Sequence, residues 1–303
     1  MIEENEAYLV LDIGGTFIKS VVLNKRGDIL KGSAFRVLSH SSKSKELIFQ
    51  SISECISNGL LLIDSVKKTL KGIGIAIPGP FDYKTGTFLM EHKFQSVYGE
   101  NLKQLIYNIP NIDKHIPICC VHDANAVLLG EQWKGRAQPY KNSAVVTLGT
   151  GIGFAFSQNT IVQCTPLCLP SITIYETPYK NGILEDYVSQ RGILEIYKEF
   201  CKKNVLENIT VFDIGKQADN EDNASIKTFG RAAEILSESI VGILQQKEIE
   251  CLLLGGQISR SYRHMEEILK ERLSGLKTLK QISPVDSIDH AAFYGILWKL
   301  LKQ

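Results

Sequence analysis

The chain has 303 residues, of which 44% are hydrophobic and 22% are charged, proportions typical of a globular protein long enough for two domains. Its formal net charge of +1 gives no electrostatic reason to expect a nucleic acid or an anionic membrane as a partner. The N-terminus is acidic rather than basic and no apolar run reaches transmembrane length, so we expect a cytoplasmic protein without a signal peptide.

The first strong pattern is an apolar strand ending at Asp12, a turn containing Gly14, Gly15 and Thr16, and a second strand that follows at once. Two adjacent glycines can adopt backbone angles closed to other residues, so we predict a tight reversal whose N–H groups point outward and receive a phosphate. Asp12 is placed to hold Mg²⁺ through water molecules, and Thr16 adds a hydroxyl. The alternative is an ordinary β-hairpin turn preceded by an acidic residue.

The chain then alternates between strand and helix patterns. In order, we predict a turn at 26–28, a strand over 29–37, a helix over 46–62, a buried strand over 72–77, a hairpin turn at 84–86, a loop over 90–101, a short helix over 102–107 and a buried strand over 116–121. The last strand runs into His122 and Asp123, from which a helix continues to about residue 134. An aspartate at this junction is also typical of a helix N-cap.

The opening pattern recurs in the second half of the chain, where Gly149, Thr150 and Gly151 form a turn between two apolar strands over 144–156. A recurrence at this spacing indicates two related halves, and two such hairpins facing each other could grip a polyphosphate. After it we predict a loop over 158–181, helices over 182–203 and 223–247, a buried strand over 249–254 that ends in Gly255 and Gly256, a basic helix over 262–273, a weak strand over 278–285 and a closing helix over 289–301. Strands alternating with helices predict an α/β fold class.

The chain contains seven cysteines, and Cys119, Cys120 and Cys251 lie in apolar strand-like runs, where buried free thiols are common. Cys164 and Cys168 are close in sequence, but no second pair of cysteines or histidines stands nearby. This spacing does not favour a zinc site.

Several motifs, taken together and in order, resemble those of the ROK family (repressors, open reading frames, kinases) of the hexokinase–actin superfamily. They are Asp12-Ile13-Gly14-Gly15-Thr16, Pro78-Gly79-Pro80-Phe81-Asp82, Asp123-Ala124-Asn125, Leu148-Gly149-Thr150-Gly151-Ile152-Gly153 and Gly255-Gly256-Gln257-Ile258. The resemblance covers nearly the whole chain and implies a two-domain hexokinase/actin-like (RNase H-like) α/β fold with an interdomain cleft. It implies a smaller N-terminal domain over 1–122, on which the C-terminal helix at 289–303 packs back, and a larger domain over 123–288.

The resemblance further implies ATP-dependent phosphorylation of a sugar hydroxyl, with ATP and Mg²⁺ as cofactors. Asp123 matches the general base that takes the proton of the attacking hydroxyl. The residues that match the nucleotide and phosphate motifs are Asp12 (which would also assist Mg²⁺), Gly14, Gly15, Thr16, Gly149, Thr150, Gly151, Gly255 and Gly256. Gly79, Asp123 and Glu185 are expected to contact the sugar, although Glu185 could instead be a first-turn acid that complements a helix dipole.

The sequence also departs from the family pattern. The usual Glu-x-Gly-His segment is missing, and Ile183 stands where the usual zinc-binding cysteine precedes Glu-x-Tyr, so we expect no zinc. Lys93 falls near the position where many members have a sugar-contacting asparagine. We expect Glu91, His92, Lys93 and Glu176 to replace the missing sugar contacts; the alternative is that these are solvated loop charges.

The leading hypothesis is therefore an ATP-dependent kinase of a hexose or hexose derivative, with Asp123 as the general base. The alternative is a non-catalytic sugar- or nucleotide-binding regulator on the same scaffold. A third possibility, an actin-like filament or chaperone ATPase, is weakened by the short chain. The first strand begins close to Met1, which leaves no room for the helix-turn-helix of the repressor members. The resemblance implies a homodimer with a small-molecule sugar as its partner and no nucleic acid or membrane partner.

Overall fold

The computed structural model describes residues 5–201 and 208–303, and it divides into two compact units. The first unit takes the residues up to 134, together with 164–171 and the residues from 290 onward. The second unit takes 135–163 and 172–289. This division differs from the predicted boundary, because the helix that begins at residue 123 belongs to the first unit. The two units are of nearly equal length, so the first is not a smaller domain as predicted.

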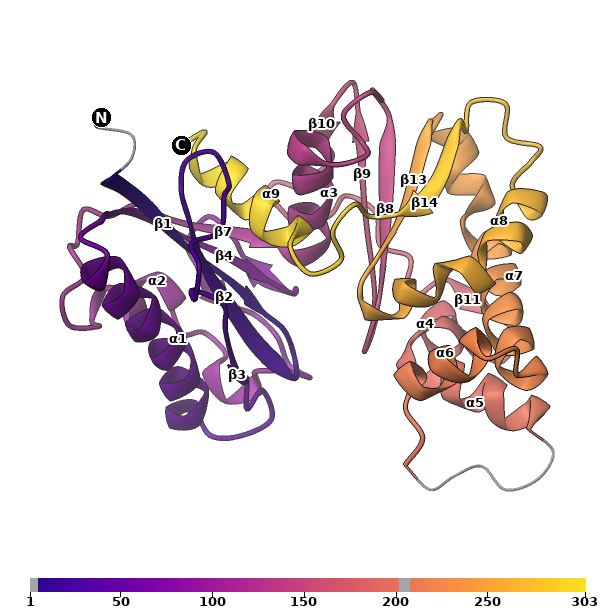
Figure 1. Cartoon of the computed structure of the whole chain (residues 1–303), viewed down its shortest axis with the longest axis horizontal. Coiled ribbons are helices and arrows are strands. Elements are labelled where there is room, and N and C mark those ends of the chain that lie inside the picture. The colour runs from indigo at the N-terminus through magenta and orange to yellow at the C-terminus, as the bar shows by residue number, and fades with distance from the viewer. Residues whose placement is uncertain (1–4, 202–207) are drawn as a thin grey trace. The chain divides into compact units, whose positions relative to one another are not determined.

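The first unit is built on a five-stranded sheet in the order β3-β2-β1-β4-β7 (Figure 1). Its strands are β1 (Glu6–Ile13), β2 (Phe17–Leu23), β3 (Phe35–Leu38), β4 (Thr69–Ile77) and β7 (Ile118–His122). The hairpin strands β1 and β2 pair antiparallel, whereas β4 pairs in parallel with both β1 and β7. Both faces of β1 are buried, which explains its nearly continuous run of apolar residues.

Helices cover the two faces of this sheet. On one face, α1 (Lys45–Ser65) and α2 (Leu102–Tyr107) pack against the β1 residues Leu9 and Leu11. On the other face, α3 (Asp123–Lys134) and α9 (Ala291–Leu300) pack against Val10. The closing helix therefore lies in the first unit, beside the helix that begins at Asp123. The remaining short elements of this unit are β5 (Phe81–Asp82), β6 (Thr87–Phe88) and the 3₁₀ helix η2 (Gln95–Val97).

The second unit repeats this strand arrangement with the order β10-β9-β8-β13-β14. Its elements are β8 (Ser143–Leu148), β9 (Ile152–Gln158), β10 (Ile161–Val162), β11 (Pro178–Tyr179), β12 (Gly182–Ile183), α4 (Leu184–Val188), α5 (Gln190–Phe200), α6 (Val211–Asp219), α7 (Asn223–Gln246), β13 (Cys251–Gly255), the 3₁₀ helix η3 (Gln257–His264), α8 (Glu266–Arg272) and β14 (Gln281–Pro284). Again the first two strands form an antiparallel hairpin and the later strands join in parallel. The predicted relation between the two halves is thus confirmed at the level of topology.

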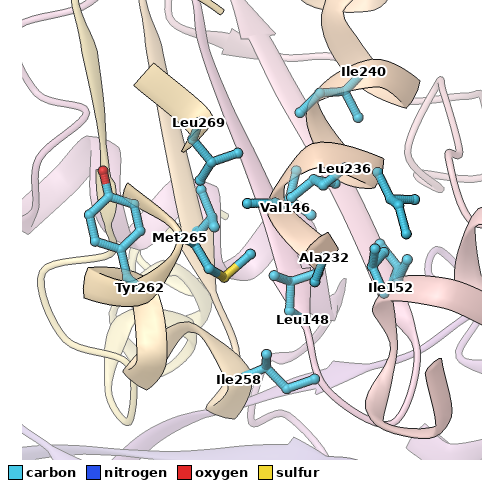
Figure 2. Close-up of a cluster of buried hydrophobic side chains, with 14 of the residues drawn as sticks. Val146, Leu148, Ile152, Ala232, Leu236, Ile240, Ile258, Tyr262, Met265 and Leu269 are labelled. Atoms are coloured by element: carbon cyan, nitrogen blue, oxygen red, sulfur yellow. The ribbon is translucent and has the colours of Figure 1, made fainter. Parts of the chain in front are cut away.

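The core of the second unit lies between its sheet and the helices α7 and α8. Figure 2 shows Val146 and Leu148 of β8 facing Leu236 of α7, with Met265 and Leu269 from the α8 side closing the cluster. Buried residues recur along α7 every three or four positions, as expected for a helix with one face in a core. This packing holds the strand that leads into the second glycine turn.

Several predicted elements were wrong in extent, including the helix over 262–273, of which residues 262–264 belong to η3 and 266–272 to α8, and the strand over 278–285, which is reduced to β14. The strand predicted over 29–37 is reduced to β3, preceded by an isolated bridge between Leu23 and Ile29. The helix predicted over 182–203 is split by Ser189, whose φ of −81° and ψ of 178° are extended, and its last two residues lie outside the described range. Helix α6 was not predicted, although its capping box supplied a signal: Thr210 and Asp213 exchange side-chain and backbone hydrogen bonds.

Helix α1 is the one helix in the described parts of the chain that is long and apolar enough to cross a membrane by length and composition, which the sequence analysis did not anticipate. Its buried residues include Ile48, Ile52, Cys55 and Ile56, all in the core beneath the first sheet. A core helix passes the same test, so α1 is weak support for a membrane span.

Candidate functional site

The first glycine turn joins β1 to β2 and is closed by a hydrogen bond from the N–H of Gly14 to the carbonyl of Phe17 (2.9 Å). Neither Gly14 nor Gly15 has a φ in the left-handed region, so the expected reason for the two glycines was wrong. At Gly14 the requirement is one of space, because a Cβ there would lie 3.1 Å from the Phe17 carbonyl oxygen; a Cβ at Gly15 would make ordinary contact with the side chain of Lys93. Among the described residues, the N–H groups of Gly15 and Thr16 donate to no carbonyl oxygen, which fits a turn that receives an anion.

Asp12 lies at the end of β1, directly opposite Lys19 of β2. Burial raises the pKa of the Asp12 carboxyl to about 6; the Lys19 ammonium opposes this rise and the Asp123 carboxylate adds to it. Two of the predicted site residues, Asp12 and Asp123, are therefore within electrostatic reach of each other. A cation held near Asp12 would relieve this repulsion, so the residues fit Mg²⁺ bound through water. No cluster of three or more metal-ligating side chains occurs within 5–201 and 208–303.

The raised pKa of Asp12 predicts a pH-dependent cost to stability. The ordinary pKa is 3.8 and the folded pKa about 6, so ionisation above pH 6 burdens the folded state, whereas below about pH 4 the carboxyl is protonated in both states. Without Mg²⁺, Asp12→Asn should therefore be more stable than the wild type by about 3 kcal/mol at pH 8, the free energy equivalent of this pKa shift, and most of this gain should be lost near pH 4. Urea unfolding at both pH values measures this difference. An equal difference at both values would contradict the assignment.

Asp123 is the first residue of α3, immediately after the parallel strand β7. Its carboxylate is 42% exposed, with Oδ1 accepting the N–H of Ala124 (2.7 Å) and lying 3.0 Å from Nδ1 of His122. Burial lowers the pKa of His122, which favours the neutral imidazole. Because an N-cap accepts the N–H two or three residues on, the bond to Ala124 does not by itself support the capping alternative. The partly exposed carboxylate is accessible to an acceptor hydroxyl, and the general-base role stays a prediction.

Gly79 lies close to the same junction, within the first unit. A Cβ at Gly79 would lie 2.9 Å from Cδ2 of Leu169 and 3.6 Å from the ring of His122. Leu169 belongs to the 164–171 segment, which Asn125 holds through hydrogen bonds from its Nδ2 to Cys164 Sγ (3.3 Å) and to the Cys168 carbonyl (3.4 Å). The structure therefore brings Gly79 next to the Asp123 junction, but the space in front of Gly79 is filled by an apolar side chain.

His92 is exposed and makes no hydrogen bond or ion pair within the described residues. No contact joins it to Gly79 or to Asp123 in that part of the chain. Its predicted role in sugar binding has no structural support beyond its position in the loop beside Lys93.

The second glycine turn joins β8 to β9, and Gly149 has open space around its Cα. Glu185, the second residue of α4, reaches this turn: Oε2 accepts the N–H of Ile152 (3.0 Å) and would lie 2.6 Å from a Cβ at Gly151. Thr150 is exposed at the tip. The structure thus places the predicted sugar contact Glu185 at the phosphate turn, so both its sugar-binding role and the first-turn alternative stay open.

Gly255 and Gly256 pack directly beside this turn. Gly255 ends β13 and pairs with Thr147 of β8. Gly256 has a φ of +80°, and a Cβ there would overlap with the backbone of Leu148, the residue before Gly149. The turn at 149–151 and the glycine pair at 255–256, which match the family's phosphate and nucleotide motifs, are therefore neighbours. A side chain at residue 256 would push these two segments apart.

Sequence reasoning missed two ionisable neighbours of the predicted site, Lys19 and His122. Lys19 could have been found, because a four-residue turn from Gly14 to Phe17 sets the pairing that puts it opposite Asp12. His122 was seen only as the end of a strand, and its proximity to the Asp123 carboxylate depends on side-chain packing that the sequence does not record.

This chain is similar to known proteins both in sequence and in fold. The sequence profile described as "ROK family" matches residues 8–164. A glucokinase of Halalkalibacterium halodurans is 26% identical over 278 residues, covering 84% of this chain and 81% of the relative. A xylose repressor of Caldicellulosiruptor bescii is 22% identical over 206 residues, covering 64% of this chain and 49% of the repressor.

A solved structure of a ROK family glucokinase from Streptomyces griseus, in complex with glucose and AMPPNP, superposes with a TM-score of 0.83 at 19% identity. The match covers 98% of this chain and 100% of that one. At this identity the likeness shows the fold, which is the predicted two-domain hexokinase/actin-like α/β fold.

Proposed function

Since this chain belongs to the ROK family, we propose that it is a kinase that transfers the γ-phosphoryl group of ATP to a hydroxyl of a hexose or hexose derivative. The observation that carries the proposal is the exposed Asp123 carboxylate, which lies at the head of α3 in the same unit as Asp12 and the first glycine turn. The likeness to a glucokinase over most of both chains supports the same class of reaction.

In the proposed reaction the acceptor hydroxyl oxygen bonds to the γ-phosphorus, and the bond to the β–γ bridging oxygen breaks, leaving its electron pair on ADP. The proton of the hydroxyl passes to the Asp123 carboxylate. The N–H groups of Gly15 and Thr16 would orient the phosphates, and Asp12 would hold Mg²⁺ through water. When bound, Mg²⁺ would neutralise part of the phosphate charge.

The second candidate function is a regulator that binds a sugar or a nucleotide without catalysis. The observation in its favour is the xylose repressor, which matches this chain over 206 residues. A binding protein needs no general base, and so it gives no reason for an exposed carboxylate at the Asp123 position.

Release of ADP separates the two candidates. The protein is incubated with ATP, Mg²⁺ and one sugar at a time: glucose, mannose, the corresponding N-acetylated amino sugars, and a β-glucoside. We expect at least one sugar to raise ADP formation well above the rate without sugar. Sugar or nucleotide binding by calorimetry, with no sugar-dependent ADP formation across the panel, would favour the regulator.

The second glycine turn offers a direct test of nucleotide binding. Because no atom lies within 4 Å of a Cβ at Gly149, Gly149→Ala should leave the fold unchanged. If phosphates approach this turn, the added methyl should disturb a charge-assisted hydrogen bond and weaken ATP binding by about 10- to 100-fold. Gly275→Ala, another substitution into open space, is the control, and calorimetric titration with ATP is the measurement. Equal affinities for both variants would remove Gly149 from the phosphate site.

The homodimeric state, the cytoplasmic location and the lack of stoichiometric zinc are further parts of this proposal and rest on the sequence alone. Sedimentation equilibrium measures the first, and elemental analysis of the purified protein measures the zinc content. One zinc per chain would contradict the proposal, with Cys164 and Cys168 as the first candidates for ligands.

A further inference from the structure

Hydrogen bonds tie three separate segments of the first unit together around the first glycine turn. The hydroxyls of Ser39 (2.7 Å) and Ser41 (2.5 Å) both donate to the carbonyl oxygen of Gly15. The N–H of Phe94 in turn donates to the carbonyl of Ser41 (2.7 Å), and the Phe94 side chain is fully buried. Lys93 directly precedes Phe94, so the backbone hydrogen bond of Phe94 holds Lys93 beside the turn.

The side chain of Lys93 lies against the open side of Gly15. A Cβ at Gly15 would lie 3.4 Å from Cδ and 3.8 Å from Nζ of Lys93. These are ordinary contact distances, so the Lys93 side chain lies directly beside the turn. The ammonium group is thus adjacent to the turn whose N–H groups are expected to receive phosphate.

The charge of Lys93 is available to a ligand. Within residues 5–201 and 208–303, Lys93 makes no hydrogen bond or ion pair. Two other cations of the described residues interact with protein groups beside the turn: Lys19, opposite Asp12 in the β1–β2 pair, acts electrostatically on that carboxyl, and the Arg36 guanidinium lies 3.4 Å from the centroid of the Phe17 ring.

We propose that Lys93 is a catalytic residue that donates hydrogen bonds to the transferring phosphoryl group, an inference that rests on the kinase activity proposed above. During transfer, as the bond from the acceptor oxygen to the γ-phosphorus forms and the bond to the β–γ bridging oxygen breaks, negative charge is spread over the non-bridging oxygens. An ammonium already placed at Gly15 stabilises this charge without reorganisation. Lys93 and Asp123 then act from the same unit, one on the phosphoryl oxygens and the other on the proton of the acceptor.

The test compares Lys93→Met, which removes the charge but keeps the length, with Lys93→Arg, which keeps the charge. Lys114→Met, at an exposed turn before β7, is the matched control. With the best sugar, kcat of the methionine variant should fall by about 10²–10³-fold, and that of the arginine variant should stay within about tenfold of the wild type. The KM for sugar should change little, and the control should retain wild-type kinetics.

Nucleotide binding gives a second readout that does not depend on turnover. Calorimetry with ADP and with the non-hydrolysable analogue AMPPNP should show that Lys93→Met weakens binding of the analogue by about tenfold and leaves ADP binding within about twofold. Turnover within threefold of the wild type, equal weakening for both nucleotides, or a rise only in the KM for sugar would overturn the proposal. If the wild type phosphorylates no sugar, the kinase proposal fails, and the comparison of ADP with AMPPNP alone decides whether Lys93 contacts the γ-phosphate.

Discussion

Replacing Asp123 by asparagine is expected to lower kcat for sugar phosphorylation by about 10²–10⁴-fold, the usual contribution of a general base. The amide cannot accept the proton of the attacking hydroxyl, but it has nearly the same shape as the carboxylate. It also keeps an oxygen that can accept the N–H of Ala124, the bond now made by Oδ1 of Asp123. The loss should therefore appear in kcat, while the affinities for sugar and nucleotide stay within a few-fold of the wild type.

This substitution separates the two interpretations of Asp123 because asparagine is as good a helix N-cap as aspartate. If Asp123 serves only the start of α3, Asp123→Asn should have wild-type turnover and wild-type stability. Asp64→Asn, an exposed carboxylate near the end of α1, controls for the general loss of one negative charge. Turnover of the Asp123 variant within a few-fold of this control would return Asp123 to a purely structural role.

The sequence was sufficient to predict both glycine hairpins, because an apolar strand, a short glycine-rich turn and a second strand are a local pattern. It did not predict why the glycines are there. Gly14 leaves room for the Phe17 carbonyl, whereas Gly15 lies beside Lys93, which only the folded chain brings to that place. Gly256 differs, because both its φ of +80° and the nearby backbone of Leu148 require glycine.

Predictions that depended on contacts between distant residues were less accurate. The helix pattern over 182–203 hides a break at Ser189, where the backbone of Gly192 packs against that of Tyr187 so closely that a Cβ at residue 192 would overlap with it. The first unit was predicted to end at residue 122, but in the structure it also includes α3, because α3 packs against α9 from the far end of the chain. Periodicity records which face of a helix is buried, but not what covers it.

The sugar-contacting residues were the least predictable part of the site. Glu185 was predicted to contact the sugar, and its carboxylate accepts the N–H of Ile152 at the phosphate turn, which leaves that role open. Gly79 was predicted to contact the sugar, and Leu169 of the same unit lies close to it, so this role stays a prediction. Both results depend on where the residues between β9 and α4 lie, and this stretch has little periodicity from which to predict a conformation.

We expect that α3 and α9 pack too closely to leave space for a side chain at residue 295. A Cβ at Gly295 would overlap with the carbonyl oxygen of Ala126 and lie 2.7 Å from the N atom of Gly130, and one at Gly130 would lie 2.8 Å from the carbonyl carbon of Ala291. These neighbours are backbone atoms of packed helices, so they cannot give way as a flexible side chain would. Gly295→Ala should therefore lower the free energy of unfolding by about 3 kcal/mol or more, at the upper end of the cost of overpacking a core.

Gly242→Ala is the matched control, because Gly242 lies within α7 with no atom within 4 Å of its Cβ position. There the same substitution should raise the free energy of unfolding by about 0.5–1 kcal/mol, the difference in helix propensity between the two residues. The free energy of unfolding of both variants is measured by urea unfolding monitored by circular dichroism. Wild-type stability of Gly295→Ala would show that the two helices can move apart without cost. Because Asp123 begins α3, a folded fraction of the Gly295 variant should also have a lowered kcat, since any displacement of this helix moves the general base away from the hydroxyl it must reach.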